Sequence, residues 1–180
     1  MKLANVSLLR GLAFALALAL PAMAANAQSL KQDCLSQEKE YAAWERCGAL
    51  IRDGALQGMD LFHALHKHAW ALKQLGKPDR ALKSFNRAVA LLPYQNKRER
   101  ASILVNRGQA HHATGNYEEA LKDFNKALKL QSFVKSPDLI AQAYFLRARS
   151  NHADGRFASA LLDAQRARDL AQNPRLIRSI

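Results

Sequence analysis

The chain has 180 residues, with 27 Lys and Arg against 15 Asp and Glu, and its formal net charge is +12. This length corresponds to one domain with a substantial core rather than to several domains. The charge is uneven, because residues 61–180 hold 21 basic and nine acidic side chains. Such a field favours acidic partners or anionic surfaces, but it does not determine the fold.

Residues 1–27 predict a secretory signal peptide. Lys2 and Arg10 precede an apolar run over 11–20, and two sites of the small-x-small type follow it. We expect cleavage after Ala27 and an exported product that is periplasmic or secreted. The apolar run is shorter than the roughly 20 residues that cross a bilayer as a helix. An uncleaved anchor is therefore the weaker alternative, and we expect no integral membrane segment once the leader is removed.

The next segment, residues 28–61, contains both cysteines of the chain. Cys34 and Cys47 lie 13 positions apart, and such a pair in an oxidising compartment favours a structural disulfide. Closing a loop of this size contributes about 3 kcal/mol in the chain-entropy model. A redox-active pair is the alternative, but the Cys-x-x-Cys spacing is absent. Residues 38–52 have apolar positions at helical spacing and predict an amphipathic helix that ends at Gly54.

One pattern then occurs three times along the chain: a glycine, an alanine five positions later and another alanine after seven more. The pattern starts at Gly76, Gly115 and Gly155, which lie 39 and 40 residues apart, and its alanines are Ala81, Ala88, Ala120, Ala127, Ala160 and Ala167. Recurrence at such a period is typical of stacked repeats. Each glycine can end one helix in a left-handed C-cap.

The elements around these glycines read as helix pairs. We expect first helices over about 60–76, 99–114 and 137–153, capped by Asp60 in the first case and by Ser136 in the third. The small residues Ala81, Ala120 and Ala160 let the second helix of each pair approach the first. Phe85 and Phe124 are expected to fill the gap between neighbouring pairs.

The segment from Gly115 to Leu128 resembles the second half of a tetratricopeptide repeat, and the residues before Gly108 are similar to the first half. The match is weaker after Gly155, where Ala164 replaces the expected phenylalanine. The resemblance implies an all-α fold: a right-handed superhelical α-α solenoid of three TPR helix pairs with an N-terminal capping helix.

In this reading the repeats run over about 62–95, 101–134 and 141–174, within an array over 62–180 that ends in a short tail. The tail has three apolar residues, Leu176, Ile177 and Ile180. They either cover the last edge of the array or leave it open for self-association or a partner.

In the family the first helices line a concave groove, which implies the candidate binding residues. Those lining positions form a basic and aromatic stripe: His63, His66, Trp70, Lys73, Ser102, Val105, Asn106, Gln109, His112, Gln142, Phe145, Arg149 and His152. Such a wall suits an extended or acidic peptide, with apolar anchors and cations that grip carboxylates. The alternative is that the aromatic residues only pack between helices and the charges are solvated.

The remaining patterns favour binding over chemistry. All six histidines fall on first helices, but only His63 and His66 have ligand spacing on one face, so we expect no metal site and no cofactor. Catalytic motifs are absent from the sequence, and the acids Glu118, Glu119 and Asp123 are attributed to turns and helix starts. Export argues against nucleic acid.

The sequence therefore predicts a non-enzymatic exported adaptor or scaffold for a protein or peptide, with an acidic partner favoured. The alternative is a binder of an anionic envelope polymer or membrane surface through its basic repeats.

Overall fold

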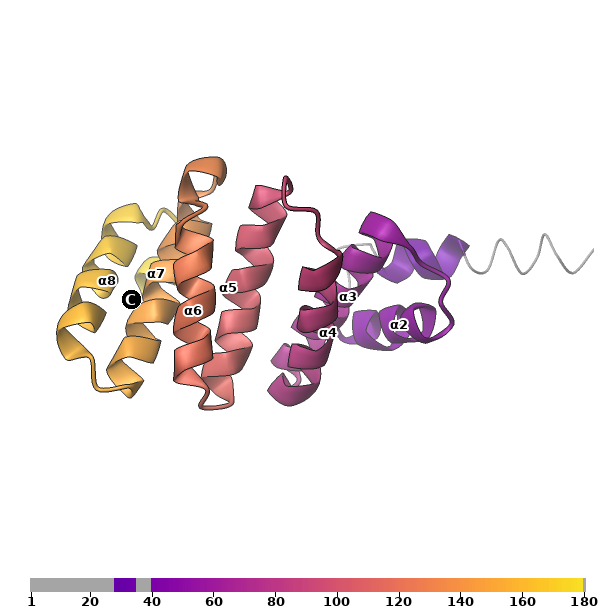
Figure 1. The fold of residues 1–180 in the computed structure, drawn as a ribbon, viewed down its shortest axis with the longest axis horizontal. Helices are drawn as coiled ribbons and strands as arrows, with labels where there is room; N and C mark the ends of the chain where they lie inside the picture. Colours follow the sequence, from indigo (N-terminus) through magenta and orange to yellow (C-terminus); the bar gives the residue numbers. More distant parts are fainter. Residues whose placement is uncertain (1–27, 35–39, 180) are drawn as a thin grey trace, which may run out of the picture.

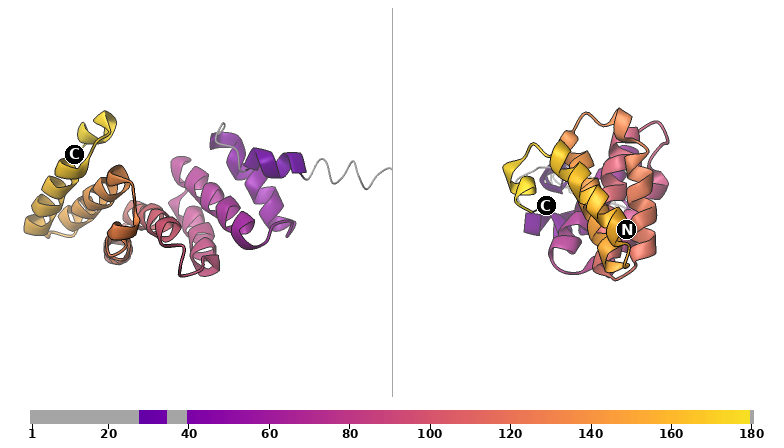
Figure 2. Two further views of the ribbon diagram at one scale, coloured as in Figure 1. Left: turned by 90° about the horizontal axis from the view of Figure 1, so that it is seen from above. Right: turned by 90° about the vertical axis from the view of Figure 1, so that its left-hand side faces the viewer.

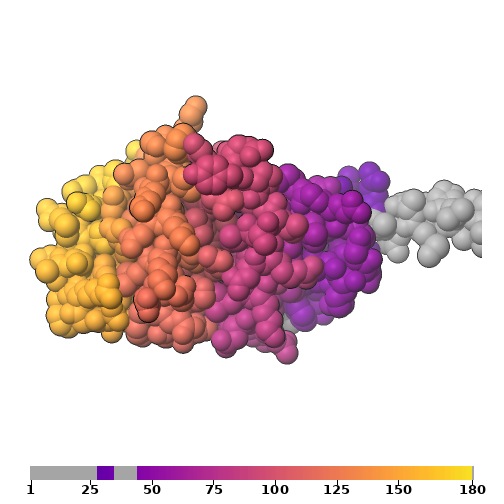
Figure 3. Space-filling view, in the orientation of Figure 1, coloured from indigo at the N-terminus to yellow at the C-terminus, as the bar shows by residue number. Residues whose placement is uncertain are grey.

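In a computed structural model, which describes residues 28–34 and 40–179, the chain is all-α and its helices pack in sequential pairs (Figure 1). The predicted leader lies outside the described residues. Three pairs follow one another: α3 (Gly58–Gln74) with α4 (Pro78–Leu91), α5 (Lys97–Ala113) with α6 (Tyr117–Leu128), and α7 (Pro137–Ala153) with α8 (Phe157–Leu170). Each pair contributes one band of an elongated body, in chain order (Figure 3).

The turns inside the pairs follow the glycine pattern. Gly76, Gly115 and Gly155 have φ values of +68°, +78° and +78°, a region that favours glycine. Each ends a first helix and lets the chain reverse within a few residues. Ser136 caps α7 as expected, since its Oγ accepts a hydrogen bond from the backbone N–H of Leu139. The cap predicted for Asp60 is wrong: α3 already begins at Gly58, and Asp60 forms an ion pair with Lys31.

Two buried clusters form the core of the three helix pairs, and each spans more than one pair. The first contains Phe62, Phe85 and, from the next pair, Ile103. The second contains Phe124 and, from the next pair, Leu146. Phe85 and Phe124 are fully buried, as the sequence predicts. Because each cluster is completed by the following helix, a single pair cannot bury its own apolar surface.

Helix α2 (Glu40–Arg52) packs on α3 at the first end of the array (Figure 1). A disulfide joins Cys34 to Cys47 and so links α2 to the helical residues 28–34. The half-cystines share a third buried cluster with Leu50 and Ala64. The segment before the first pair is therefore attached to α3 both covalently and by apolar packing.

The first helices form the inner layer of the array. Helix α3 contacts α5, and α5 contacts α7, whereas α4 and α6 contact chiefly the helices before and after them in the chain. Close approach of the first helices curves the row toward them, as seen from above (Figure 2). Between the last two pairs a short 3-10 helix, η1 (Gln131–Phe133), leads into α7, and α9 (Pro174–Ile177) ends the described chain.

Candidate peptide-binding groove

The inner face of α3, α5 and α7 carries the residues that the sequence places in the groove. His63, Arg149 and His152 are exposed there, and His66, Trp70, Lys73, Ser102, Asn106, Gln109, His112, Gln142 and Phe145 are partly exposed. Val105 differs, because it is 1% exposed and packs in the second core cluster. The face is thus open to a ligand at most of the predicted positions, but Val105 belongs to the core.

A polar network joins α3 to α5 at one end of this face. The Lys73 ammonium donates hydrogen bonds to Oδ1 of Asn106 and to Oε1 of Gln109. Asn106 is also hydrogen-bonded through Nδ2 to Nε2 of His66, at 3.2 Å. Since the amide Oδ1 accepts from lysine, Nδ2 is the donor, and Nε2 of His66 must carry a lone pair. The network therefore requires a neutral His66.

The environment of the network shifts both titratable groups. Burial, together with the positive charges of His63 and Lys73, lowers the pKa of His66 to about 4. Burial also lowers the pKa of Lys73 to about 8. At neutral pH His66 is therefore uncharged while Lys73 is mostly protonated. Both hydrogen-bond partners of the ammonium are neutral amides, so they accept from two of its three N–H groups without balancing its charge.

A second hydrogen bond joins α5 to α7 further along the face. His112 Nδ1 lies 2.9 Å from Ser150 Oγ. Burial, followed by the charge of Arg149, lowers the pKa of His112. Lys73 and His112 occupy equivalent places in successive repeats, and each reaches the next first helix. Both side chains therefore stabilise the contact between neighbouring repeats.

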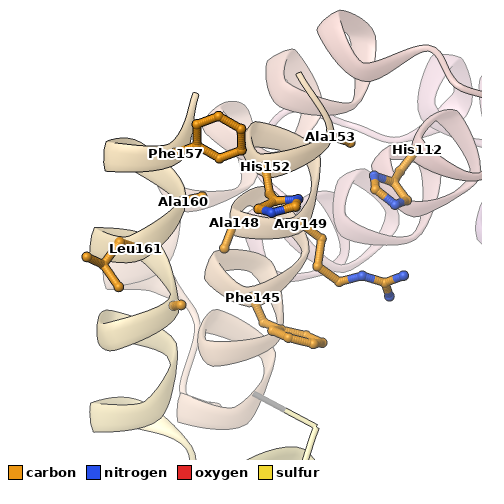
Figure 4. A pocket seen from close by; sticks show the side chains of 10 residues that line it. His112, Phe145, Ala148, Arg149, His152, Ala153, Phe157, Ala160 and Leu161 are labelled. Carbon is orange, nitrogen blue, oxygen red and sulfur yellow. The ribbon is translucent and has the colours of Figure 1, made fainter. Parts of the chain in front are cut away.

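The last part of the face is more open and more apolar. The guanidinium of Arg149 lies 5.9 Å from the ring centre of Phe145, and the His152 ring meets Phe157 at 5.3 Å. These residues border a hollow of about 530 Å³ between α7 and α8 (Figure 4). Within the part of the chain that the structure describes, no three His, Cys, Asp or Glu side chains lie close enough to hold a metal ion.

Two ion pairs on the outer side, Arg107 with Asp123 and Arg147 with Asp163, were not predicted from the sequence. Arg107 on α5 binds both carboxylate oxygens of Asp123 on α6, at 2.6 and 2.7 Å, and donates to Asn86 on α4 at 3.0 Å. Asp123 is 2% exposed. Its assignment to a helix start is therefore wrong: it lies inside α6 as the buried partner of an arginine.

The same arrangement recurs in the next repeat. Arg147 binds both oxygens of Asp163 and donates to Asn125 at 2.6 Å. In the first repeat the equivalent positions are His68 and Ser84, and their side chains are hydrogen-bonded at 2.9 Å. The signal was present in the sequence as an arginine and an aspartate that both recur after 40 residues.

These features define the chain as an α-solenoid, a row of stacked helix-turn-helix repeats with an exposed inner face. The buried carboxylates of Asp123 and Asp163 are paired with arginines that also reach the preceding repeat.

The chain is a tetratricopeptide repeat protein. Tetratricopeptide repeat family profiles match residues 62–93 and 99–173. Among solved structures the chain is similar to BtubC (BKLC) from P. vanneervenii, with a TM-score of 0.63 and 19% identity over 73% of this chain. The match spans 59% of BtubC, so the chain corresponds to little more than half of that protein. At this identity the likeness establishes the fold alone. No curated protein matches.

Within the described ranges, none of the helices is both long and apolar enough to cross a membrane. Tetratricopeptide repeats typically mediate protein–protein interactions, and the family is generally non-catalytic. The Cys34–Cys47 disulfide is typical of an oxidising compartment.

Proposed function

We propose that the protein is a non-enzymatic exported adaptor that binds an acidic peptide segment of a partner protein along the inner face of α3, α5 and α7. The disulfide and the predicted leader support a periplasmic or secreted location. The partner class follows from the family and from the charge of the face.

The observation that carries the proposal is the uncompensated charge of Lys73. A half-buried ammonium is costly unless an opposite charge lies beside it, yet among the residues that the structure describes Lys73 donates only to the amides of Asn106 and Gln109. A carboxylate from a ligand would balance this charge at short range. Trp70, one helical turn earlier on the same face, offers an apolar surface for the neighbouring ligand side chain.

Arg149 supplies a second cation further along the face, next to the ring of Phe145. A ligand that spans both sites would run along the groove and place acidic residues near its two ends. Because the repeats are joined by hydrogen bonds across this face, the two cations are held at a fixed separation. Such preorganisation reduces the entropic cost of binding.

The test uses the full chain, exported and processed by a bacterial host, and a set of labelled peptides that differ only in acidic content. We expect the acidic peptides to bind with micromolar affinity and Lys73→Met to weaken them at least tenfold. Lys126→Met is the matched control, because Lys126 is exposed on α6, away from the inner face. With Trp44→Phe as background, Trp70 is the only remaining tryptophan, and its emission should change on binding.

Salt separates this function from its alternative. Binding to an anionic polymer through distributed lysines and arginines would fall steeply with ionic strength and would weaken equally in the Lys73 and Lys126 variants. A groove that also uses Trp70 should retain much of its affinity in salt. Equal losses in the two variants would contradict the groove proposal.

A further inference from the structure

The outer face of α8 matches a surface that is covered in the two preceding repeats. Leu121 on α6 is 6% exposed and lies beside Arg147 and Asn151 of α7, and Leu82 on α4 packs against the cluster that α5 completes. The equivalent residue on α8 is Leu161, which is 73% exposed. Phe157, one turn earlier on the same helix, is 63% exposed. Helix α8, the second helix of the third pair, thus exposes an apolar surface that in the first two pairs is covered by the following helix.

A hollow opens beside this surface because one large side chain is replaced by a small one. Phe85 and Phe124 fill the space between their own helix pair and the next helix, and both are fully buried. Ala164 occupies the equivalent place in α8. The resulting hollow of about 530 Å³ lies between α7 and α8, and Phe145, Phe157 and Leu161 lie at its edge (Figure 4).

The series of hydrogen bonds between first helices also stops at α7 in the described part of the chain. Lys73 donates to Gln109 on the next first helix, and His112 is hydrogen-bonded to Ser150 on the one after it. His152 is the third member of this series. It is exposed, and its ring contacts Phe157 at the rim of the hollow.

The tail does not supply a further helix over this surface in the part of the chain that is described. After α8 the chain turns back toward the start of α7, where the backbone N–H groups of Gln172 and Asn173 donate to Asp138 Oδ1 at 2.8 and 2.9 Å. Helix α9 follows from this point and leaves Leu161 exposed.

The charges around this surface of α8 indicate what kind of helix it could bind. Phe157, Leu161, Ala164 and Arg168 fall on one face of α8, because they are spaced by four, three and four residues. Arg168 occupies the place of Leu128, which is 6% exposed in α6. Where α6 has a buried leucine, α8 therefore has an exposed arginine, which lies at the end of the apolar stripe formed by Phe157, Leu161 and Ala164. On the inner side Arg149 borders the hollow.

We propose that the outer face of α8 docks an amphipathic helix of a partner protein, which inserts apolar side chains beside Ala164 and sets an acidic residue against Arg168. The docked helix continues the interface that α5 and α7 form with the repeats before them. A second copy of the chain is disfavoured, because a symmetric contact would bring the same arginines together on chains of net charge +12. The inference does not rest on the Lys73 site of the groove proposal, although the hollow shares Phe145 and Arg149 with the groove.

The probe is a labelled synthetic peptide with the sequence of α7, Pro137–Ala153, and two changes. Ile140→Glu places an acid where α7 meets the cluster containing Leu128, and Ala143→Phe places a ring where α7 meets Phe124. Fluorescence anisotropy with the full processed chain should show saturable binding. We expect Ala164→Phe, which fills the hollow with the residue type of the other repeats, to weaken binding at least tenfold.

A charge exchange tests the contact with Arg168. Arg168→Glu should weaken the probe at least tenfold, and a peptide with lysine instead of glutamate at position 140 should bind this variant and not the parent chain. Lys126→Glu is the control with the same charge change at an exposed position of α6, and it should bind the probe as the parent does.

Three results would overturn the inference. They are a probe that does not bind, a probe that binds the Ala164→Phe and Arg168→Glu variants as tightly as the parent, and a dimer in sedimentation that Leu161→Asp dissociates. The last result would assign the face to a second copy of the chain. Equal losses of acidic-peptide binding in Lys73→Met and Lys126→Met, with probe binding that Ala164→Phe still weakens, would contradict the groove proposal alone. Probe binding that Ala164→Phe and Arg168→Glu leave unchanged would contradict this inference alone, so the two can fail separately.

Discussion

Arg147 and Asp163 form a two-pronged ion pair between α7 and α8, with Nε and Nη2 each 2.7 Å from a carboxylate oxygen. Asp163 is 3% exposed, so its charge depends on this partner. The third donor of the guanidinium reaches Asn125 in the preceding repeat. One arginine therefore joins three helices.

Removing the arginine should destabilise the fold more than removing a surface charge. Arg147→Met leaves the buried Asp163 carboxylate with only the amide of Asn151 and the more distant Arg166, and we expect a loss of about 3 kcal/mol in the free energy of unfolding. Arg166→Met is the matched control, because Arg166 is exposed and its nitrogen lies 4.0 Å from the same carboxylate. We expect it to cost less than about 0.5 kcal/mol. Denaturant unfolding monitored by circular dichroism measures both, and equal losses would contradict the role given to Arg147.

Gly108 is required by close packing and not by its backbone angles. A Cβ atom at this position would lie 2.7 Å from Cε1 of Phe124, which is fully buried. We expect Gly108→Ala to overpack this contact and to destabilise the protein by about 1 to 3 kcal/mol. Thermal and denaturant unfolding give the value.

The double variant Gly108→Ala with Phe124→Leu is the control for this cause. If the clash with the ring is responsible, the alanine should cost much less in the leucine background. An unchanged cost would place the strain elsewhere.

Stability should fall with acid in a way that depends on His66. The pKa of His66 is lowered to about 4 in the folded chain from its ordinary 6.5, so the unfolded chain binds more protons between these values. Stability is then complete above pH 6.5 and is lost as pH falls toward 4. The shift corresponds to about 2 kcal/mol at pH 5 relative to pH 8.

The matched variant is His66→Gln, whose amide oxygen can still accept from Asn106 but does not titrate. Unfolding free energies from pH 8 to 5 should fall less steeply in this variant than in the parent. The two curves are compared directly, since carboxylates contribute equally to both. Parallel curves would show that His66 is not the group responsible.

The disulfide should stabilise the first end of the array. Replacing Cys34 and Cys47 together by serine removes the link between residues 28–34 and α2, and we expect a loss of about 3 kcal/mol. Trp44, on α2, reports the local change through its fluorescence. Hydrogen exchange should increase in α2 and stay unchanged in α7. A uniform increase in all helices would instead show that the array unfolds as one unit.

The repeat pattern was readable because it depends on backbone turns and small residues. The left-handed glycines and the alanines that allow close packing are needed in every repeat, so Gly115 and Ala120 have counterparts at a fixed spacing. The residue at which a helix begins was harder to predict from the sequence. Asp60 looks like a helix cap in the sequence, but the chain enters α3 two residues earlier and Asp60 binds Lys31 instead.

The buried polar contacts could not be read with the same ease, because they cross between helices far apart in the sequence. An aspartate near a helix start is common, and only the joint recurrence of Arg107 with Asp123 would have indicated a pair. The open face of α8 is a further example. Leu161 and Leu121 each follow an alanine and lie two residues before an aspartate. Leu121 is 6% exposed and Leu161 is 73% exposed, a difference that the sequence pattern does not indicate.

The arginines on the outer side and the hydrogen bonds of Lys73 and His112 on the inner side tie each repeat to the next at both rims. Hydrogen bonds on both sides of the contact between two repeats restrict bending and twisting of one repeat relative to the next. The curvature of the solenoid is therefore set by the chain itself. A peptide bound in the proposed groove would have to match the spacing of the binding residues, so its length would matter as much as its charge.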